Sequence, residues 1–219
     1  MILAAGRGER MLPLTRFLPK PLLQVNGETL LERHVARLRR AGFTELVINV
    51  SYLGERIEQH LGAGEAFGVH IQYSREPDGP METAGGIARA LGLLGEGPFV
   101  VVNADVWTAF NFSRLRSRID QAHIVLVPNP AHNVGGDFAL QAGRLRLEGS
   151  ESFTYAGIGV FRSEFFDAVG TSRIGLGHLL RDAAAVGMAS GEIFYGTWFD
   201  VGTPERLAEA RGHRSIQAK

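Results

Sequence analysis

The sequence predicts an α/β fold in which a mostly parallel sheet is covered by helices on both faces. Short apolar runs alternate with amphipathic segments through the first half of the chain, a pattern typical of buried parallel strands and their connecting helices. After residue 127 the runs are joined by short turns, which favours antiparallel pairing. We expect one domain over residues 1–219, with a core over 1–127 and a second part over 128–219 that joins the same sheet.

The elements of the first part follow from the spacing of apolar residues. Leu30, Leu31, Val35 and Leu38 recur at helical spacing, and Gly42 ends that helix. His34 lies on or near its apolar face, and we interpret it as a buried, hydrogen-bonded imidazole rather than a catalytic one. The predicted strands are 1–4, 45–50, 69–73, 99–102 and 124–127, and the other predicted helices are 54–61, 83–94 and 112–118.

The second part begins with three predicted strands over 137–140, 144–147 and 155–161. A helix over 176–186 and a strand over 193–195 follow. Thr203 and Pro204 have the residue types of an N-cap and a first helical position, so a helix begins there.

Composition excludes several classes of protein. The formal net charge is zero, so no global field attracts nucleic acid or a membrane surface. The chain has no cysteine, which excludes disulfides and thiolate chemistry. No signal peptide or membrane-spanning run is present, and we expect a cytoplasmic protein. Lys20 and Lys219 are the only lysines.

The opening stretch Leu3–Met11 has the residue types of a polyphosphate cradle. Gly6 and Gly8 allow a sharp turn after a strand and leave backbone N–H groups bare, and Arg10 and Lys20 follow as cations. The stretch lacks the third glycine of the dinucleotide fingerprint and is not a P-loop. A chance glycine pair with solvated cations remains the alternative at this point.

Three later motifs each follow a strand pattern. Residues 76–87 form a Pro- and Gly-rich loop before a helix, a place where α/β sheets bind ligands. Asp105 follows the strand 99–102, and Asp200 lies within the stretch 198–203. Two carboxylates with substrate phosphates suit Mg²⁺, although a lone Asp after a strand is as often a turn former.

Together these motifs resemble the sugar-1-phosphate nucleotidyltransferases, in the family's order and over nearly the whole chain. The stretch Leu3–Met11 with Pro19-Lys20-Pro21 is the most specific part. Within the family, Gly136-Asp137-Phe138, residues 153–158 and the short length look most like the N-acetylmuramate-1-phosphate uridylyltransferases of peptidoglycan recycling.

The resemblance implies a Rossmann-like enzyme with a mixed sheet that uses UTP, Mg²⁺ and a sugar-1-phosphate such as N-acetylmuramic acid 1-phosphate. It implies a nucleotide-binding core over 1–127 and a sugar-binding part over 128–219. Arg10, Lys20 and Asp105 would be catalytic, and Asp105 and Asp200 would hold the metal. The implied nucleotide-binding residues are Leu3, Ala4, Ala5, Gly6, Gly8, Glu76, Gly79, Glu82 and Thr83. The implied sugar-side residues are Asn103, Asp137, Glu148, Tyr155 and Gly157.

One departure concerns the acceptor phosphate. Many relatives carry a mid-chain lysine that grips it, whereas this chain has none, so Arg144, Arg162 or the metal would replace it. Glu82 also stands where the broader family commonly has a glycine. Alternatives are a mannose-1-phosphate guanylyltransferase, another NDP-sugar synthase, or a non-catalytic nucleotide-sugar sensor. The sequence leaves the sugar and the oligomeric state open, with a monomer as one expectation.

Overall fold

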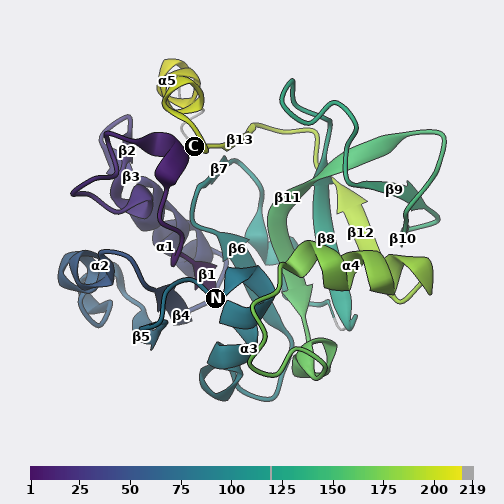
Figure 1. The fold of residues 1–219 in the computed structure, drawn as a ribbon, viewed down its shortest axis with the longest axis horizontal. Helices are drawn as coiled ribbons and strands as arrows, with labels where there is room; N and C mark the ends of the chain where they lie inside the picture. Colours follow the sequence, from purple (N-terminus) through teal and green to yellow (C-terminus); the bar gives the residue numbers. More distant parts are fainter. Residues whose placement is uncertain (119, 214–219) are drawn as a thin grey trace.

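The computed structural model describes residues 1–118 and 120–213. Within them, nine strands form one mixed sheet in the order β5-β4-β1-β6-β11-β8-β12-β10-β9, and two further pairs of strands lie beside it (Figure 1). The mixed α/β sheet expected from the sequence is therefore confirmed. The strands of the main sheet are β1 (Ile2–Leu3), β4 (Glu45–Val50), β5 (His70–Arg75), β6 (Phe99–Asn103), β8 (Ala122–Val127), β9 (Phe138–Gln141), β10 (Arg144–Arg146), β11 (Ser152–Phe161) and β12 (Ala189–Ile193).

The first four strands of that order run parallel to one another. β1 lies between β4 and β6, so that Leu3 is level with Asn49 on one side and with Asn103 on the other. The chain passes from β1 outward to β4 and β5 and then returns to β6 on the opposite side of β1. This reversal is a topological switch point, and open α/β sheets bind ligands outside the carboxyl ends of the strands at such a point.

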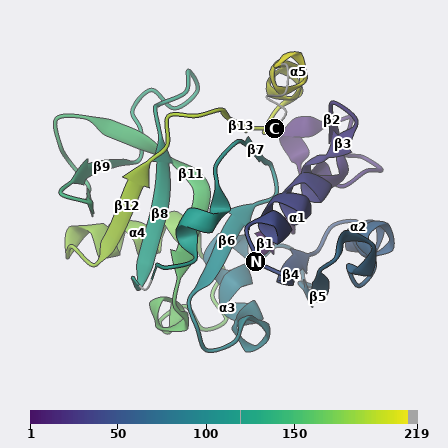
Figure 2. The same ribbon diagram turned by 180° about the vertical axis from the view of Figure 1, so that it is seen from behind.

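Helices cover both faces of the sheet, and each face has its own apolar core. Helices α3 (Glu82–Leu94) and α4 (Leu176–Ala185) lie in front of the sheet in Figure 1 and bury one cluster of core residues. Helix α1 (Leu30–Arg40) lies on the opposite face, seen in Figure 2, and shares a second cluster with α2 (Gly54–Leu61). The helical periodicities of the sequence thus match burial on two separate faces.

A third, smaller cluster lies beside the main sheet. It joins Met11 of the opening loop, Trp107 of β7 (Val106–Thr108), Val201, and Leu207 of α5 (Pro204–Gly212). The hairpin of β2 (Gln24–Val25) and β3 (Glu28–Thr29) adds Val25 to the same cluster. β7 pairs with β13 (Trp198–Asp200), which ties the end of the chain to the loop after β6. The cluster therefore fixes the opening loop against the C-terminal helix.

The antiparallel additions predicted for the second part are confirmed. β11 pairs antiparallel with β6, β8 and β9, and β9 pairs antiparallel with β10. The Thr203 hydroxyl accepts a hydrogen bond from the Arg206 N–H, and Pro204 opens α5, as the cap pattern predicts. The capping box of α1 is also complete, between Thr29 and Glu32.

Two predicted elements are wrong. The strand expected over 193–195 is β12, Ala189–Ile193, whose small residues have low intrinsic strand preference. Tertiary contacts explain it, because a Cβ at Gly191 would lie 2.9 Å from Leu145 Cδ2, so only a slender chain fits between the neighbouring strands. The helix expected over 112–118 is a single 3₁₀ turn, Phe112–Leu115, since Asn111 caps Ser113 and no second apolar turn follows.

None of the helices in residues 1–118 and 120–213 is both long and apolar enough to cross a bilayer. Lys219 lies outside the described residues.

His34 is buried in the core as predicted, edge-on to Phe112. The expected hydrogen bond is wrong, because neither ring nitrogen has a partner at hydrogen-bonding geometry among the described residues. Burial lowers its pKa to about 4, against an opposing attraction from the Asp105 carboxylate. In an unfolded chain, a histidine has a pKa of about 6.5. The folded protein thus keeps His34 neutral at pH values where the same side chain is protonated in the unfolded chain. The native state is therefore penalised as the pH falls below that unfolded value.

We predict that acid weakens the fold through His34. Between pH 8 and pH 4 the wild type should lose about 3 kcal/mol more free energy of unfolding than a His34→Gln variant, measured by urea denaturation. The comparison at pH 8 is the control, because both side chains are neutral there and any difference reflects packing. Parallel pH dependences for the two proteins would contradict the prediction.

Candidate active site

A cavity of about 480 Å³ opens at the carboxyl ends of the parallel strands. It is bordered by Leu3 at the end of β1, Asn49 near the end of β4, Glu76 just after β5, and Asn103 at the end of β6. Its size is typical of a site for a small molecule. The other lining residues are Ala4, Ala5, Gly6, Arg7, Gly8, Glu9, Arg10, Lys20, Pro21, Pro80, Glu82, Thr83, Ala104, Asp105 and Gly202.

The opening loop forms one wall of this cavity. Gly8 has a left-handed backbone with φ of 66°, and a Cβ there would lie 3.0 Å from Thr15 Cγ2 and 3.2 Å from Lys20 Cβ. Glycine is therefore required at residue 8 both for the turn and for the close approach of the chain. Gly6 has open space around it, so its backbone is left uncovered at the cavity wall. The predicted cradle residues 3–6 and 8 thus lie together.

Lys20 reaches across the cavity to Asp105. Its Nζ lies 2.5 Å from Asp105 Oδ2, and the two side chains are 13% and 28% exposed. Asp105 lies in the turn between β6 and β7, and its backbone carbonyl accepts a hydrogen bond from the Val201 N–H. The ion pair is partly shielded from water and consequently holds Lys20 over the cavity more firmly than a solvated pair would.

Asp200 comes next to Asp105 through the pairing of β13 with β7. Asp200 is level with Val106, the residue that follows Asp105. Its Oδ2 accepts a hydrogen bond from Arg206 Nη1 at 2.5 Å, and its Oδ1 lies 3.1 Å from His132 Nε2. Asp200 does not itself line the cavity, but Gly202, two residues later, does. The described residues contain no cluster of three or more metal-ligating side chains.

Both carboxylates have the donor chemistry that Mg²⁺ prefers. Each offers hard oxygen donors, each is partly exposed, and each is paired with a cation, Lys20 or Arg206. Mg²⁺ commonly takes one or two protein carboxylates and completes its shell with water and substrate phosphates.

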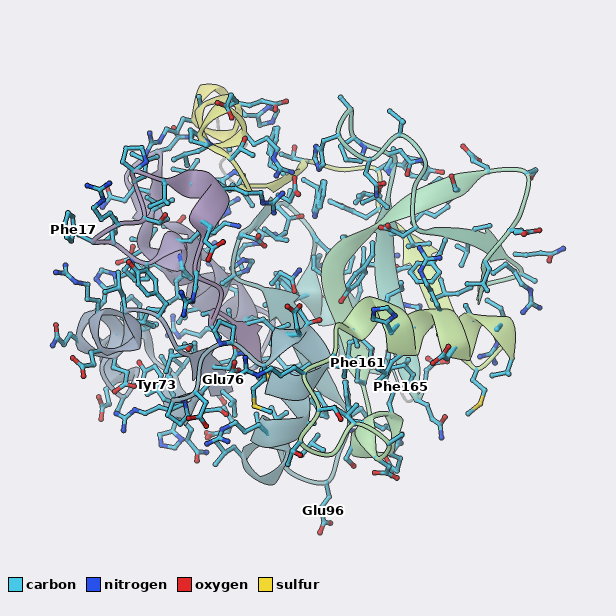
Figure 3. All side chains as sticks on the ribbon, in the orientation of Figure 1. Phe17, Tyr73, Glu76, Glu96, Phe161 and Phe165 are labelled. Atoms are coloured by element: carbon cyan, nitrogen blue, oxygen red, sulfur yellow. The ribbon has the colours of Figure 1, made fainter. Side chains whose placement is uncertain are left out.

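A hydrogen-bonded relay connects the opening loop with the loop after β5. The Ala4 N–H donates to Asn49 Oδ1 at 2.8 Å, and Asn49 Nδ2 donates to Glu76 Oε1 at 2.7 Å. Glu76 Oε2 accepts from the Met81 N–H at 2.8 Å. Glu76 is only 2% exposed, and Figure 3 labels it between the β4–β5 side of the sheet and α3. Both of its oxygens are engaged, which favours a positioning role for Glu76.

Asn49 is a polar residue within an apolar strand, and this exception is the sequence signal that could have identified it as a site residue. The run Leu46-Val47-Ile48-Asn49-Val50 is otherwise apolar, and a buried polar side chain needs partners. Sequence reasoning did not select Asn49. A Cβ at Gly86 would lie 2.6 Å from Glu76 Oε1 and 2.8 Å from Asn49 Nδ2, so the glycine allows α3 to approach the relay.

Glu82 and Thr83 begin α3 at the far wall of the cavity. Glu82 is exposed and has φ of 62°, a left-handed conformation that side chains rarely adopt. Thr83 Oγ1 accepts a hydrogen bond from the Leu176 N–H at 2.6 Å and so ties α3 to α4. Gly79, also predicted here, has φ of 92° and does not border the cavity. A strained glutamate at a cavity wall is typical of a functional position.

The predicted sugar-side residues are only partly brought together. Asn103 lies against Gly157, whose Cβ position would be 2.7 Å from Asn103 Nδ2. Asp137 accepts hydrogen bonds from the Tyr155 N–H and from Asn133 Nδ2, at 2.8 and 3.3 Å. The Tyr155 ring packs against the α3–α4 core, and burial raises its hydroxyl pKa. Glu148 is exposed in the loop between β10 and β11.

Neither arginine proposed to replace the missing lysine borders the cavity. Arg162 follows β11, which runs antiparallel to β6, so it lies beside Phe99 at the opposite end from Asn103. Arg144 is on β10, between β12 and β9 near the sheet edge. The direction of β11 decides where Arg162 lies, and the order of the strands decides where Arg144 lies. The sequence alone predicts neither. Sequence reasoning also missed Arg206 and His132, for which no motif gave a signal.

The strain at Glu82 leads to a prediction. Replacing Glu82 by glycine should raise the free energy of unfolding by about 1 kcal/mol, because glycine adopts the left-handed conformation without the steric cost. Thermal denaturation measures the change. Ala142→Gly, at φ of 48° in an exposed turn outside the cavity, is the matched control for release of strain. If Glu82→Gly lowered the stability while Ala142→Gly raised it, the Glu82 side chain would be a structural contact instead.

The comparisons with known proteins agree with this architecture. The family model described as nucleotidyl transferase matches residues 1–132. An N-acetylmuramate alpha-1-phosphate uridylyltransferase of Neisseria meningitidis serogroup B is 49% identical, over 96% of each chain. A protein of the same name from Caulobacter vibrioides is 33% identical, over 96% of this chain and 97% of the relative.

A solved structure extends the likeness to the fold. A putative glucose-1-phosphate thymidylyltransferase from Bacillus anthracis superposes with a TM-score of 0.84, covering 98% of this chain and 95% of that chain at 20% identity. On the family match over more than half of its length and the full-length likeness to two uridylyltransferases, the chain belongs to the nucleotidyl transferase family.

Proposed function

We propose that this nucleotidyltransferase transfers a uridylyl group from UTP to N-acetylmuramic acid 1-phosphate and releases pyrophosphate. The observation that carries the proposal is the cavity at the carboxyl ends of the parallel strands. There a bare glycine loop and Arg10 border the same cavity as the ion pair of Lys20 with Asp105. The names of the two full-length relatives support the uridylyl group and the sugar. The proposal extends to a role in peptidoglycan recycling in the cytoplasm.

The reaction is an in-line displacement at the α-phosphorus. An oxygen of the sugar-1-phosphate attacks, the new P–O bond forms, and the bond to the β-phosphate oxygen breaks so that pyrophosphate leaves. No protein nucleophile or general base is needed, because the attacking oxygen is already an anion. The enzyme accelerates the step by positioning the two substrates and neutralising their charges.

The residues of the cavity divide this task. The opening loop offers backbone N–H groups to the triphosphate, as bare amides do in other phosphate cradles. Arg10 would hold the departing phosphates, and Lys20 would face the α-phosphate. The Lys20–Asp105 ion pair keeps the lysine directed into the cavity before substrate arrives.

Mg²⁺ is part of the proposal. Asp105 and Asp200 would hold it, and when bound it supplies positive charge that neutralises the reacting phosphates. Lys20 and Arg206 keep these two carboxylates paired and oriented in its absence.

The relay from Ala4 through Asn49 and Glu76 to Met81 would set the distance between the phosphate cradle and the loop that faces the base. Glu82 would present its side chain at that loop, where its strained backbone directs it from the start of α3. Asn103 and Gly157 would border the sugar.

A pyrophosphate-release screen tests the function directly. UTP, GTP, CTP, ATP and dTTP are crossed with the 1-phosphates of N-acetylmuramic acid, N-acetylglucosamine, glucose and mannose. We expect UTP with N-acetylmuramic acid 1-phosphate to give the highest kcat/KM. A preference for GTP with mannose-1-phosphate would contradict the proposal and identify a guanylyltransferase. Absence of pyrophosphate release in every combination would favour a nucleotide-sugar sensor.

The proposed metal ligands give a second prediction. Asp105→Asn and Asp200→Asn should each lower kcat at least roughly 100-fold at saturating Mg²⁺. Each substitution removes a carboxylate ligand from the Mg²⁺ that would stabilise the charge of the transition state. Circular dichroism should show that both variants fold normally. Asp182→Asn, an exposed carboxylate on α4, is the matched control and should leave kcat unchanged. Near-normal turnover in either active-site variant would remove that residue from the metal site.

A further inference from the structure

The acceptor phosphate has no assigned cation in this protein. Two anionic substrates must meet at one phosphorus atom, and each requires compensation of its charge. Among the described residues, Lys20 is the only lysine, and it is bound to Asp105. Arg144 and Arg162 do not border the cavity, and Arg7 and Arg10, which do, belong to the loop that faces the triphosphate.

Arg206 is a cation that lies against the cavity wall at Gly202, although it is not itself one of the lining residues. It is in the first turn of α5, where the Thr203 cap fixes the backbone, and its side chain is only 14% exposed. Its guanidinium covers Gly202, a residue of the cavity wall, since a Cβ at Gly202 would lie 2.1 Å from Arg206 Nη2. The same point is 3.4 Å from Arg10 Nη2.

Two guanidinium groups therefore converge on one glycine. Two like charges that approach the same residue repel each other, and an anion between or beside them compensates this repulsion. Asp200 provides one negative charge, through its 2.5 Å contact with Arg206 Nη1. A phosphate at this position would provide more, and the planar fork of arginine donors matches phosphate oxygens. The arrangement is suited to an anionic group from the substrate.

Arg206 also touches the segment on the sugar side. Its Nη1 lies 2.8 Å from His132 Nε2. The neighbouring Asn133 donates to Asp137 Oδ1 and to Thr154 Oγ1, so this segment is tied to β11. Arg206 thus lies between Gly202 on the cavity wall and the 132–137 segment, which carries the predicted sugar-side residue Asp137.

We propose that Arg206 binds the phosphate of the sugar-1-phosphate and replaces the mid-chain lysine that this chain lacks. Its N–H groups donate to the phosphate oxygens that do not attack, while the attacking oxygen stays free. In the absence of substrate, Asp200 and His132 hold the guanidinium in place. This inference rests on the proposed transfer to a sugar-1-phosphate.

The test compares Arg206→Ala and Arg206→Lys with Arg211→Ala, using the nucleotide and sugar pair that the wild type prefers in the pyrophosphate-release screen. Arg211 is on the same helix but bonds the Gln24 carbonyl at an exposed position, so it controls for loss of charge from α5. Arg206→Ala should raise the KM for the sugar-1-phosphate roughly 10- to 100-fold and change the KM for the nucleotide less than twofold. Arg206→Lys should recover part of the loss, and Arg211→Ala should match the wild type.

Calorimetric titration of N-acetylmuramic acid 1-phosphate into the protein with a non-hydrolysable UTP analogue adds a readout independent of turnover. Arg206→Ala should weaken this binding by the same factor. An unchanged acceptor affinity, with a higher Mg²⁺ requirement or nucleotide KM, would overturn the proposal and make Arg206 a positioning residue for Asp200. If Arg206→Ala folds poorly, Arg206→Lys carries the same comparison. A wild type inactive with every sugar-1-phosphate would instead refute the proposed function.

Discussion

The parallel pairing of β1 between β4 and β6 is the constraint on which the rest of the site depends. β1 has only two residues, yet its register makes Leu3, Asn49 and Asn103 level with one another at the edge of the sheet. The glycine loop, Asn49 of the relay and Asn103 consequently all start from one line of backbone. A shift of β1 by one residue would turn Leu3 to the other face of the sheet and move the glycine loop out of line with Asn49 and Asn103.

A second pairing, of β7 with β13, adds what the parallel strands cannot supply. It brings Asp200 beside the turn that carries Asp105, although the two residues are far apart in the chain. The small cluster that includes Met11, Trp107, Val201 and Leu207 buries the contact between these segments. Apolar packing thereby holds the two carboxylates close to the opening loop, where two unpaired negative charges would repel each other.

Charge compensation has the same form at both carboxylates. Asp105 is paired with Lys20 and Asp200 with Arg206, and each pair is only partly exposed. Each pair therefore consists of an anion suited to a metal ion and a cation suited to a phosphate. The relay through Asn49 and Glu76 adds a further means of positioning, because its hydrogen bonds join two loops and Glu76 is buried from solvent. The strained Glu82 remains the feature of the wall that packing alone does not explain.

The sequence alone determined the local elements and the residue types of the phosphate cradle. Apolar spacing predicted α1 and β4, cap residues predicted α5, and the glycines with Arg10 and Lys20 predicted a phosphate loop, because these signals act over a few neighbouring residues. Tertiary structure decided the rest. β12 forms from small residues only because its neighbours leave a narrow space, and Arg162 is directed away because β11 runs antiparallel to β6. The contacts of Lys20 with Asp105 and of Arg206 with Asp200 depend on strand order and pairing across the sheet, which local sequence patterns do not encode.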